Sequence, residues 1–235
     1  MLVRWLWSVN GEAGFPIGNK VVRERYFVTV AADDLRRPTV YFDFLCPWAY
    51  RGAMWLKAVE DAARINPEWR FFSLSENHRV REGQGGRPVW EGEGQAAGIP
   101  AFRAAIAARR QGDQAYDRFR QALQRARHEG YLKADLLETH RQAAATAGLD
   151  LERFHRDLAE VDLTPLAEEH AEAVRRGVFG VPTLVWPNGR SYYLKITDVP
   201  PADRAVALYD AIAGIHAFDQ VIEIKTPESE GTLAA

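Results

Sequence analysis

The chain has 235 residues, of which 47% are hydrophobic and 26% are charged, and its formal net charge is -2. This length suits one large domain or a domain that carries an insertion, with ample material for a core. The near-neutral charge gives no electrostatic footprint for nucleic acid or an anionic membrane surface, and no apolar run approaches the about 20 residues that span a bilayer.

The sequence carries no recognisable signal for export, disulfide formation or metal binding. Residues 1–8 contain one charge and a very short apolar stretch without a small-residue cleavage site, so we expect no signal peptide. Cys46 is the only cysteine, which excludes an intramolecular disulfide. The six histidines are scattered and form no metal-ligand spacing, so we expect no metal site. These features together predict a cytoplasmic protein.

Residues 1–37 are predicted to form an N-terminal extension that precedes the main domain. Asn10-Gly11 is a turn signal, and Tyr26–Val30 has the aromatic and β-branched content of a strand. These signals favour a hairpin or an edge strand, with a loosely ordered extension as the alternative.

The main domain begins near Pro38 with a strand, a helix and a second strand. Thr39–Leu45 is apolar and rich in aromatics, which is typical of a buried strand, and helix-compatible sequence follows from Trp48 to about Ile65. Trp69–Leu74 predicts the second strand. Two parallel strands joined by a helix make a right-handed βαβ unit.

Residues 75–163 are predicted to be an insertion that consists of a loop and several helices. Ser75–Gly98 is rich in Gly, Arg, Glu and Gln, and loops of this length are often lids or binding segments. From Pro100 to about Ala159 the chain is rich in Ala, Arg and Glu and free of strand signals. We therefore expect an all-helical insertion between the second and third strands.

The main domain resumes over residues 164–225. A helix over residues 164–176 precedes an apolar strand that ends at Trp186, and Asn188-Gly189 is a strong hairpin turn signal before a return strand. A last helix spans about residues 201–215, and residues 226–235 are predicted to be a flexible tail. Residues 38–74 and 164–225 together therefore predict one α/β domain whose small sheet ends in an antiparallel hairpin.

The strand-to-helix junction at Cys46 is the candidate reactive site. Pro47 fits the first position of the following helix, where its missing N–H costs nothing. A thiol at this junction faces the unpaired N–H groups and the positive end of the helix, which favour thiolate over thiol. Cysteines so placed have pKa values lowered to roughly 3.5–7.5 from about 8.5. We therefore predict that Cys46 is a nucleophile with a lowered pKa.

The order of elements resembles the thioredoxin fold, with Cys46-Pro-Trp-Ala49 after the first strand and Gly180-Val-Pro182-Thr183 before the third. More specifically, the chain resembles the DsbA-like superfamily with a helical insertion. The branch that it resembles contains the FrnE-type thiol-disulfide oxidoreductases, the 2-hydroxychromene-2-carboxylate isomerases and the kappa-class glutathione transferases. The resemblance covers roughly residues 38–215.

This resemblance implies that the Val181–Pro182 peptide bond is cis and packs against the active-site turn of Cys46. The Val181 N–H and C=O would then face the thiol, where an extended peptide or the cysteinyl part of glutathione can pair with them as an added strand. Gly180 permits close backbone approach. Gly180, Val181 and Pro182 are therefore the expected substrate- or thiol-binding residues.

The chain departs from the redox-active members of the family at Ala49, where they carry the second cysteine of Cys-x-x-Cys. A dithiol resolves its mixed disulfide internally, whereas Cys46 would need an external thiol for release. The isomerases and transferases carry serine at the position of Cys46 and bind glutathione. The Cys46-Pro-Trp-Ala49 turn lies between these two arrangements.

Three functional hypotheses follow. The leading one is a thiol-disulfide oxidoreductase that acts through Cys46 with an external low-molecular-weight thiol. The second is a glutathione-dependent isomerase or transferase, and the third is a degenerate thioredoxin fold that binds a peptide or a partner. We expect no tightly bound cofactor, glutathione or a similar thiol as cosubstrate, and a small thiol or disulfide as substrate. The sequence leaves open whether the chain forms a homodimer.

Two residues beside Cys46 carry alternative roles. Trp48 either faces the substrate or belongs to the core, and its place on the first helical turn favours the active-site surface. Asp43 either tunes the Cys46 thiol or forms a structural ion pair, because buried carboxylates are costly unless paired. The arginines that follow the second strand either form a solvated face or bind a carboxylate of the cosubstrate: Arg79, Arg81 and Arg87.

Overall fold

The computed structural model describes residues 35–92, 96–215, 218 and 220–225. The hairpin expected within residues 1–37 and the tail expected over residues 226–235 therefore lie outside the described residues, apart from residues 35–37.

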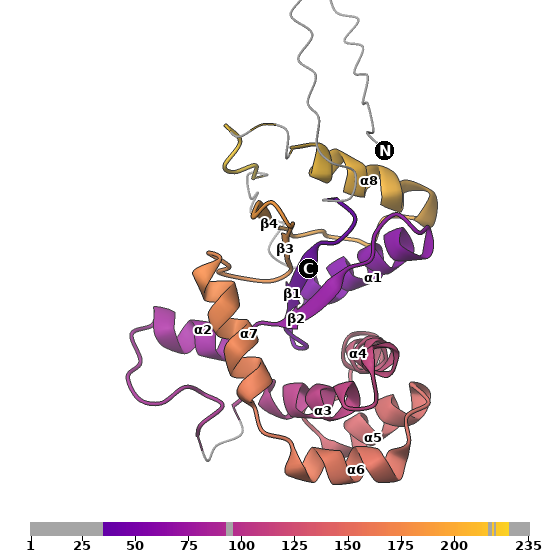
Figure 1. Cartoon of the computed structure of the whole chain (residues 1–235), viewed down its shortest axis with the longest axis vertical. Coiled ribbons are helices and arrows are strands. Elements are labelled where there is room, and N and C mark those ends of the chain that lie inside the picture. Colours follow the sequence, from indigo (N-terminus) through magenta and orange to yellow (C-terminus); the bar gives the residue numbers. More distant parts are fainter. Residues whose placement is uncertain (1–34, 93–95, 216–217, 219, 226–235) are drawn as a thin grey trace, which may run out of the picture.

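A four-stranded sheet forms the centre of the described part of the chain (Figure 1). Its strand order is β2-β1-β3-β4. β1 pairs in parallel with β2 and antiparallel with β3, and β3 pairs antiparallel with β4 across the hairpin. The strands are β1 (Thr39–Phe42), β2 (Glu68–Phe71), β3 (Thr183–Val185) and β4 (Ser191–Tyr193).

Helices cover the sheet on both sides. α1 (Pro47–Asp61) and α8 (Ala202–Gly214) pack against each other on one side, and α7 (Thr164–Arg175) lies on the other side next to α2 (Leu74–Arg81) (Figure 1). Trp55 on α1 donates its indole N–H to the carbonyl of Ala205 on α8 at 2.9 Å, which ties the two helices together.

The remaining helices form a separate layer between β2 and β3 in the sequence, at the bottom of Figure 1. They are α3 (Ile99–Arg109), α4 (Asp113–His128), α5 (Leu137–Thr146) and α6 (Leu151–Glu160). The predicted α/β fold with an all-helical insertion is therefore confirmed within the described residues.

Two strands end earlier than predicted, because side chains next to them close turns. β1 stops at Phe42 rather than Leu45, since the carboxylate of Asp43 accepts the N–H of Leu45 at 2.8 Å. β2 stops at Phe71 rather than Leu74, since Ser73 caps the next helix.

The segment predicted as a loop over Ser75–Gly98 begins with α2, so that prediction was wrong for its first part. The hydroxyl of Ser73 accepts the N–H of Glu76 at 3.2 Å. Ser73 followed three residues later by Glu76 is the capping-box pattern, and this local signal was present in the sequence.

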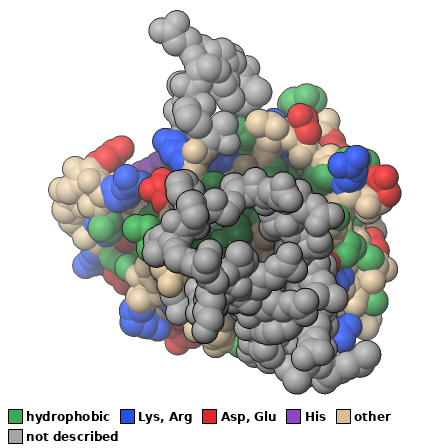
Figure 2. All heavy atoms as spheres, turned by 90° about the horizontal axis from the view of Figure 1, so that it is seen from above, with side chains coloured by type: hydrophobic (Ala, Val, Ile, Leu, Met, Phe, Trp, Pro, Cys, Tyr) green, Lys and Arg blue, Asp and Glu red, His purple; other side chains and the backbone are tan. Residues whose placement is uncertain are grey.

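Charges of both signs are interspersed on the face that Figure 2 shows. Figure 2 shows Lys and Arg side chains alternating with Asp and Glu side chains around the rim of that face. In the part of the chain that the structure describes, no helix combines the length and the apolar character that a membrane span requires.

Glu169 on α7 joins the sheet to the helical insertion. One carboxylate oxygen accepts the backbone N–H of Phe71 on β2 at 2.6 Å, and the other accepts from the guanidinium of Arg109 on α3 at 2.6 Å. The same guanidinium lies 4.3 Å from the ring centroid of Phe71 and 4.4 Å from that of Tyr116. Three elements that are distant in sequence therefore meet at one carboxylate.

We predict that Glu169→Ala lowers the free energy of unfolding by about 2–3 kcal/mol, because it leaves a backbone N–H and a guanidinium without their acceptor. Urea denaturation of the variant measures this change. Glu168→Ala, on the exposed face of the same helix, is the matched control and should change stability by less than about 0.5 kcal/mol. Equal stabilities of the two variants would contradict a joining role for Glu169.

His170, the next residue on α7, is buried and neutral. Its Nδ1 accepts the N–H of Ser73 at 3.2 Å, and its ring stacks on Phe72 with centroids 4.7 Å apart. Trp90 approaches the ring edge-on at 5.4 Å. Burial lowers the pKa of His170 to about 4, against the smaller opposing effect of the Glu76 charge.

This burial predicts a pH-dependent stability. The unfolded histidine has a pKa of about 6.5, so protons favour the unfolded chain as the pH falls from about 6.5 toward the folded value. Between about pH 7.5 and about pH 5, His170 should cost the wild type about 2 kcal/mol of stability.

His170→Asn keeps an acceptor for the Ser73 N–H and removes the titration. Other titrating groups are common to both proteins and cancel in the difference between their denaturation free energies. If the free energy of unfolding of the wild type minus that of His170→Asn did not change with pH, His170 would not titrate as its burial requires.

Candidate active site

The thiol of Cys46 lies at the N-terminus of α1. Cys46 is the N-cap residue, with φ -80 and ψ 116, and its sulfur accepts the N–H of Ala49 at 3.4 Å. Pro47 occupies the first turn as predicted from the sequence, and the backbone N–H of Trp48 also interacts with the sulfur. The N–H groups at the start of the helix therefore converge on the thiol.

The thiol also contacts the loop before β3. The Val181–Pro182 peptide bond is cis, and the S–H of Cys46 donates to the carbonyl of Val181 at 3.5 Å. The carbonyl of Pro182 accepts the N–H of Leu194 at 3.0 Å, so this loop is also bonded to the segment after β4. The structure thus brings Cys46, Val181 and Pro182 together, although 135 positions separate the first two.

Gly52 makes this approach sterically feasible. A Cβ atom at Gly52 would lie 2.8 Å from Cγ of Pro182, which is closer than carbon atoms tolerate. Gly52 could not be recognised from the sequence, because a glycine in mid-helix carries no local sign of the surface that packs on it.

Gly180 has a related role that differs in detail from the expected one. A Cβ atom at Gly180 would lie 3.2 Å from the ring of Tyr193, so the absent side chain makes room for an aromatic ring of the same chain. The carbonyl of Gly180 accepts from the hydroxyl of Thr183 at 2.7 Å, which closes the turn into β3.

The prediction of a lowered thiol pKa is wrong for the free protein. Only 7% of Cys46 is exposed, and this burial raises the pKa of the thiol above its ordinary value. The N–H groups of Ala49 and Trp48 lower it, but they do not overcome the loss of hydration. Burial therefore favours the thiol over the thiolate in the free protein.

Asp43 is a structural residue whose charge works against a thiolate. Its carboxylate accepts the N–H of Leu45 and that of Leu74, each at 2.8 Å, and so ties the turn after β1 to the start of α2. Burial raises the pKa of Asp43 to about 6. The negative charge of Asp43 also raises the pKa of Cys46, so Asp43 disfavours the thiolate.

Trp48 is half-buried, and two cations lie close to its ring. The guanidinium carbon of Arg51 is 4.9 Å from its ring centroid, and the ammonium nitrogen of Lys195 is 5.5 Å from it. Lys195 is also 6.0 Å from the ring of Tyr193, and its charge lowers the pKa of Cys46. Arg51 lies three positions after Trp48 on α1, so helical spacing alone could have indicated this contact. Only the tertiary fold brings Lys195 to the same ring.

Arg79, which the sequence offered as a contact for a cosubstrate carboxylate, is engaged elsewhere. Its guanidinium donates to both carboxylate oxygens of Glu76, at 2.8 and 2.6 Å.

A helix of the insertion contacts the residues on both sides of the Cys46 turn. His128, the last residue of α4, donates its Nε2–H to the carbonyl of Phe44 at 2.9 Å, and its ring stacks on Tyr50 with centroids 4.8 Å apart. The hydroxyl of Tyr50 donates to Glu129. Burial lowers the pKa of His128, which keeps the ring neutral.

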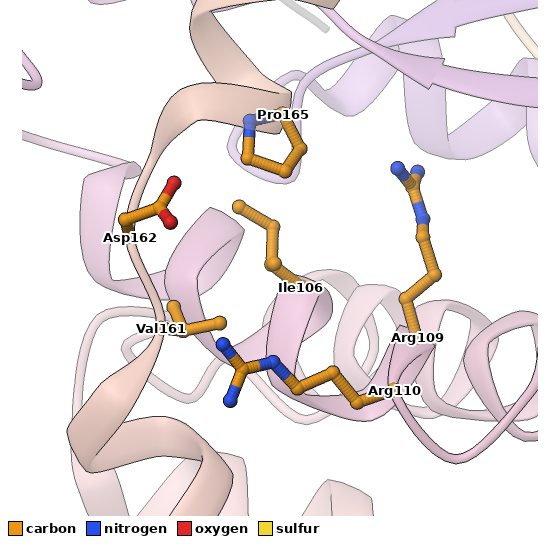
Figure 3. Close-up of a pocket in the computed structure, with 6 residues that line it drawn as sticks. All are labelled: Ile106, Arg109, Arg110, Val161, Asp162 and Pro165. Atoms are coloured by element: carbon orange, nitrogen blue, oxygen red, sulfur yellow. The ribbon is translucent and has the colours of Figure 1, made fainter.

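A pocket of about 260 Å³ lies elsewhere, between α3 and the segment that leads into α7 (Figure 3). None of the residues of the Cys46 site lines it. The residues around it are Ile106, Arg109, Arg110, Val161, Asp162 and Pro165. Among the described residues, no group of three or more His, Cys, Asp or Glu side chains is arranged to hold a metal ion.

Comparison with known sequences shows the family and a relative of similar length. The family model of the DSBA-like thioredoxin domain matches residues 39–213. The uncharacterized protein Rv2286c of Mycobacterium tuberculosis is 28% identical over 198 residues, which cover 80% of this chain and 81% of that protein.

Two solved structures illustrate the shared fold. A 2-hydroxychromene-2-carboxylate isomerase superposes with a TM-score of 0.56 at 18% identity, over 77% of this chain and 96% of that chain. The cytosolic disulfide reductase DsbM from Pseudomonas aeruginosa superposes with a TM-score of 0.53 at 19% identity, over 76% of this chain and 99% of that chain. At these identities the likeness concerns the fold alone.

The geometry of Cys46 predicts the pH profile of its alkylation. The rate with iodoacetamide should keep rising through about pH 8.5, because burial disfavours the thiolate. The same chain unfolded in urea is the matched control and should titrate at a lower pH than the folded protein. A rate that levels off below about pH 7.5 would show that the helix terminus outweighs burial. Because Cys46 is the only cysteine, the label reports this site alone.

Proposed function

Because the chain belongs to the DSBA-like thioredoxin domain family, we propose that it is a thiol-disulfide oxidoreductase that works through the single thiol of Cys46. The observation that carries this proposal is the position of the sulfur. It accepts the Ala49 N–H at the N-terminus of α1 and touches the carbonyl of Val181 on the opposite loop. An external low-molecular-weight thiol, glutathione or a similar compound, completes the cycle.

The exchange takes place in two balanced steps. Cys46 loses its proton to solvent, and the thiolate attacks one sulfur of a substrate disulfide, forming a mixed disulfide and releasing the other sulfur as a thiolate. The thiolate of the external thiol then attacks the substrate sulfur of the mixed disulfide. This second step releases Cys46 as a thiolate and leaves the substrate joined to the external thiol.

The N–H groups at the start of α1 act in both steps. They stabilise negative charge on the sulfur of Cys46, first when it attacks and then when it leaves. Burial opposes the thiolate in the free protein. The N–H groups at the start of α1 therefore stabilise the thiolate most strongly once a substrate has excluded water from the sulfur.

Val181 supplies the contact for the substrate backbone. Its N–H makes no hydrogen bond to any of the residues that the structure describes, and its carbonyl accepts only the S–H of Cys46 there. An extended substrate, including the cysteinyl part of glutathione, can pair with these two groups as an added strand. The sulfur of such a substrate then lies beside Cys46.

Two features support an external thiol. Ala49 is buried where a resolving cysteine would stand, and the sequence contains no other cysteine that could release the mixed disulfide. A structure of the disulfide reductase DsbM, which shares this fold at 18% identity, contains GSH. Glutathione is therefore the first thiol to test.

The second candidate is a glutathione-dependent isomerase or transferase. The lack of a resolving thiol at Ala49 favours it, together with the fold shared with the 2-hydroxychromene-2-carboxylate isomerase. In that case Cys46 would hold the glutathione thiolate by a hydrogen bond without forming a disulfide.

Mass spectrometry after exposure to oxidised glutathione tests the leading proposal. We expect the wild type to gain one glutathione and to lose it when free glutathione is added. Ala49→Cys supplies an internal resolving thiol, so its adduct should be replaced by a disulfide within the chain. Cys46→Ser should gain no adduct.

The absence of an adduct on the wild type would contradict thiol-disulfide exchange. Glutathione-dependent turnover of an aryl halide that persists in Cys46→Ser would instead support the isomerase or transferase function.

A further inference from the structure

Two cations beside Trp48, on the first turn of the helix that begins at Cys46, make no ion pair with any described residue. Arg51 and Lys195 both lie close to the Trp48 ring, at 4.9 and 5.5 Å from its centroid. Neither forms a salt bridge within the described part of the chain, whereas Arg70, Arg79 and Arg109 each have a carboxylate partner there.

The guanidinium of Arg51 shows this most clearly. Its Nη1 atom is buried and has no hydrogen-bond partner among the described residues. A buried donor without an acceptor is costly, and no carboxylate of the described residues offsets the charge of this guanidinium. Because the donor carries a positive charge, an anionic oxygen is the acceptor that relieves this cost best.

Lys195 extends the positive charge to the thiol. Its ammonium group lies near Trp48 and Tyr193, and it is one of the charges that act on Cys46. The opposing carboxylate of Asp43 is buried and already accepts two backbone N–H groups. The approach to the sulfur over Trp48 is therefore positively charged.

We propose that Arg51 and Lys195 select anionic substrates, namely low-molecular-weight disulfides and thiols that carry a carboxylate or a sulfonate close to the sulfur. This inference rests on the proposed thiol-disulfide exchange at Cys46. The negative group meets the ammonium of Lys195 and the guanidinium of Arg51 beside Trp48 while the disulfide meets the sulfur. Arg51 and Lys195 are thus specificity-determining residues and take no part in breaking or forming a bond.

Three symmetric disulfides of similar length and different charge test the inference: dithiodipropionate, hydroxyethyl disulfide and cystamine. The readout is the rate of mixed-disulfide formation at Cys46, divided by the rate of each disulfide with the uncharged thiol 2-mercaptoethanol. We expect the wild type to prefer the anionic over the cationic disulfide by about tenfold or more at low salt, with the preference shrinking as salt is added.

The variants assign the preference to the two residues. Lys195→Gln and Arg51→Gln should each reduce it several-fold, and Lys195→Glu should reverse it. Lys133→Gln changes the net charge equally at an exposed position after α4 and should leave the preference intact. Because Lys195 is exposed, its variants should fold normally, and far-ultraviolet circular dichroism checks this.

The outcomes separate this inference from the proposed function. Adducts that form with all three disulfides at similar normalised rates would overturn charge selection and leave thiol exchange standing. A preference that survives in Lys195→Glu would also overturn it. If none of the three disulfides forms an adduct, thiol exchange itself fails, and the inference fails with it.

Discussion

The contact between the thiol of Cys46 and the carbonyl of Val181 is the interaction on which the site depends. It exists because β1 and β3 are antiparallel neighbours, with Tyr41 opposite Thr183, so the end of β1 lies beside the start of β3. The turn that follows β1 therefore faces the loop that precedes β3. Gly52 completes the arrangement, because any side chain at that position would collide with Pro182. The thiol of Cys46 and the backbone of Val181 that contacts it thus come from two segments that are far apart in sequence.

Two opposing effects act on the thiol at this point, and burial prevails in the free protein. The N–H groups at the start of α1 favour a thiolate, whereas the loss of hydration and the charge of Asp43 disfavour it. A lone thiol that stays protonated is protected from indiscriminate oxidation, since the thiolate is the reactive form. Reactivity then depends on what enters the site. In the proposed mechanism, an anionic substrate is drawn in by Arg51 and Lys195, and it excludes water while the helix terminus stabilises the developing charge.

The helical insertion is part of this arrangement rather than an independent appendage. Glu169 binds both a backbone N–H of β2 and the guanidinium of Arg109 on α3, so the sheet and the insertion share one carboxylate. At the other end, His128 of α4 donates to the carbonyl of Phe44, just before the active-site turn. Residues of the insertion therefore hold the segment that presents Cys46, and a disturbance of their packing reaches the thiol through rigid contacts.

The mixed α/β fold with its helical insertion and the strand-to-helix junction at Cys46 follow from local sequence patterns. These predictions depend on residues a few positions apart, namely Pro47 on the first helical turn and Asn188-Gly189 in the hairpin. The Ser73–Glu76 cap of α2 is a local signal of the same kind. The tertiary structure decided the rest. The pKa of Cys46 is raised because distant parts of the chain bury it. The need for glycine at position 52 comes from Pro182, which is 130 positions away in sequence. One of the cations near Trp48 is Lys195, which follows β4. Desolvation, close packing and charge act through space, so a linear pattern of residues does not carry them.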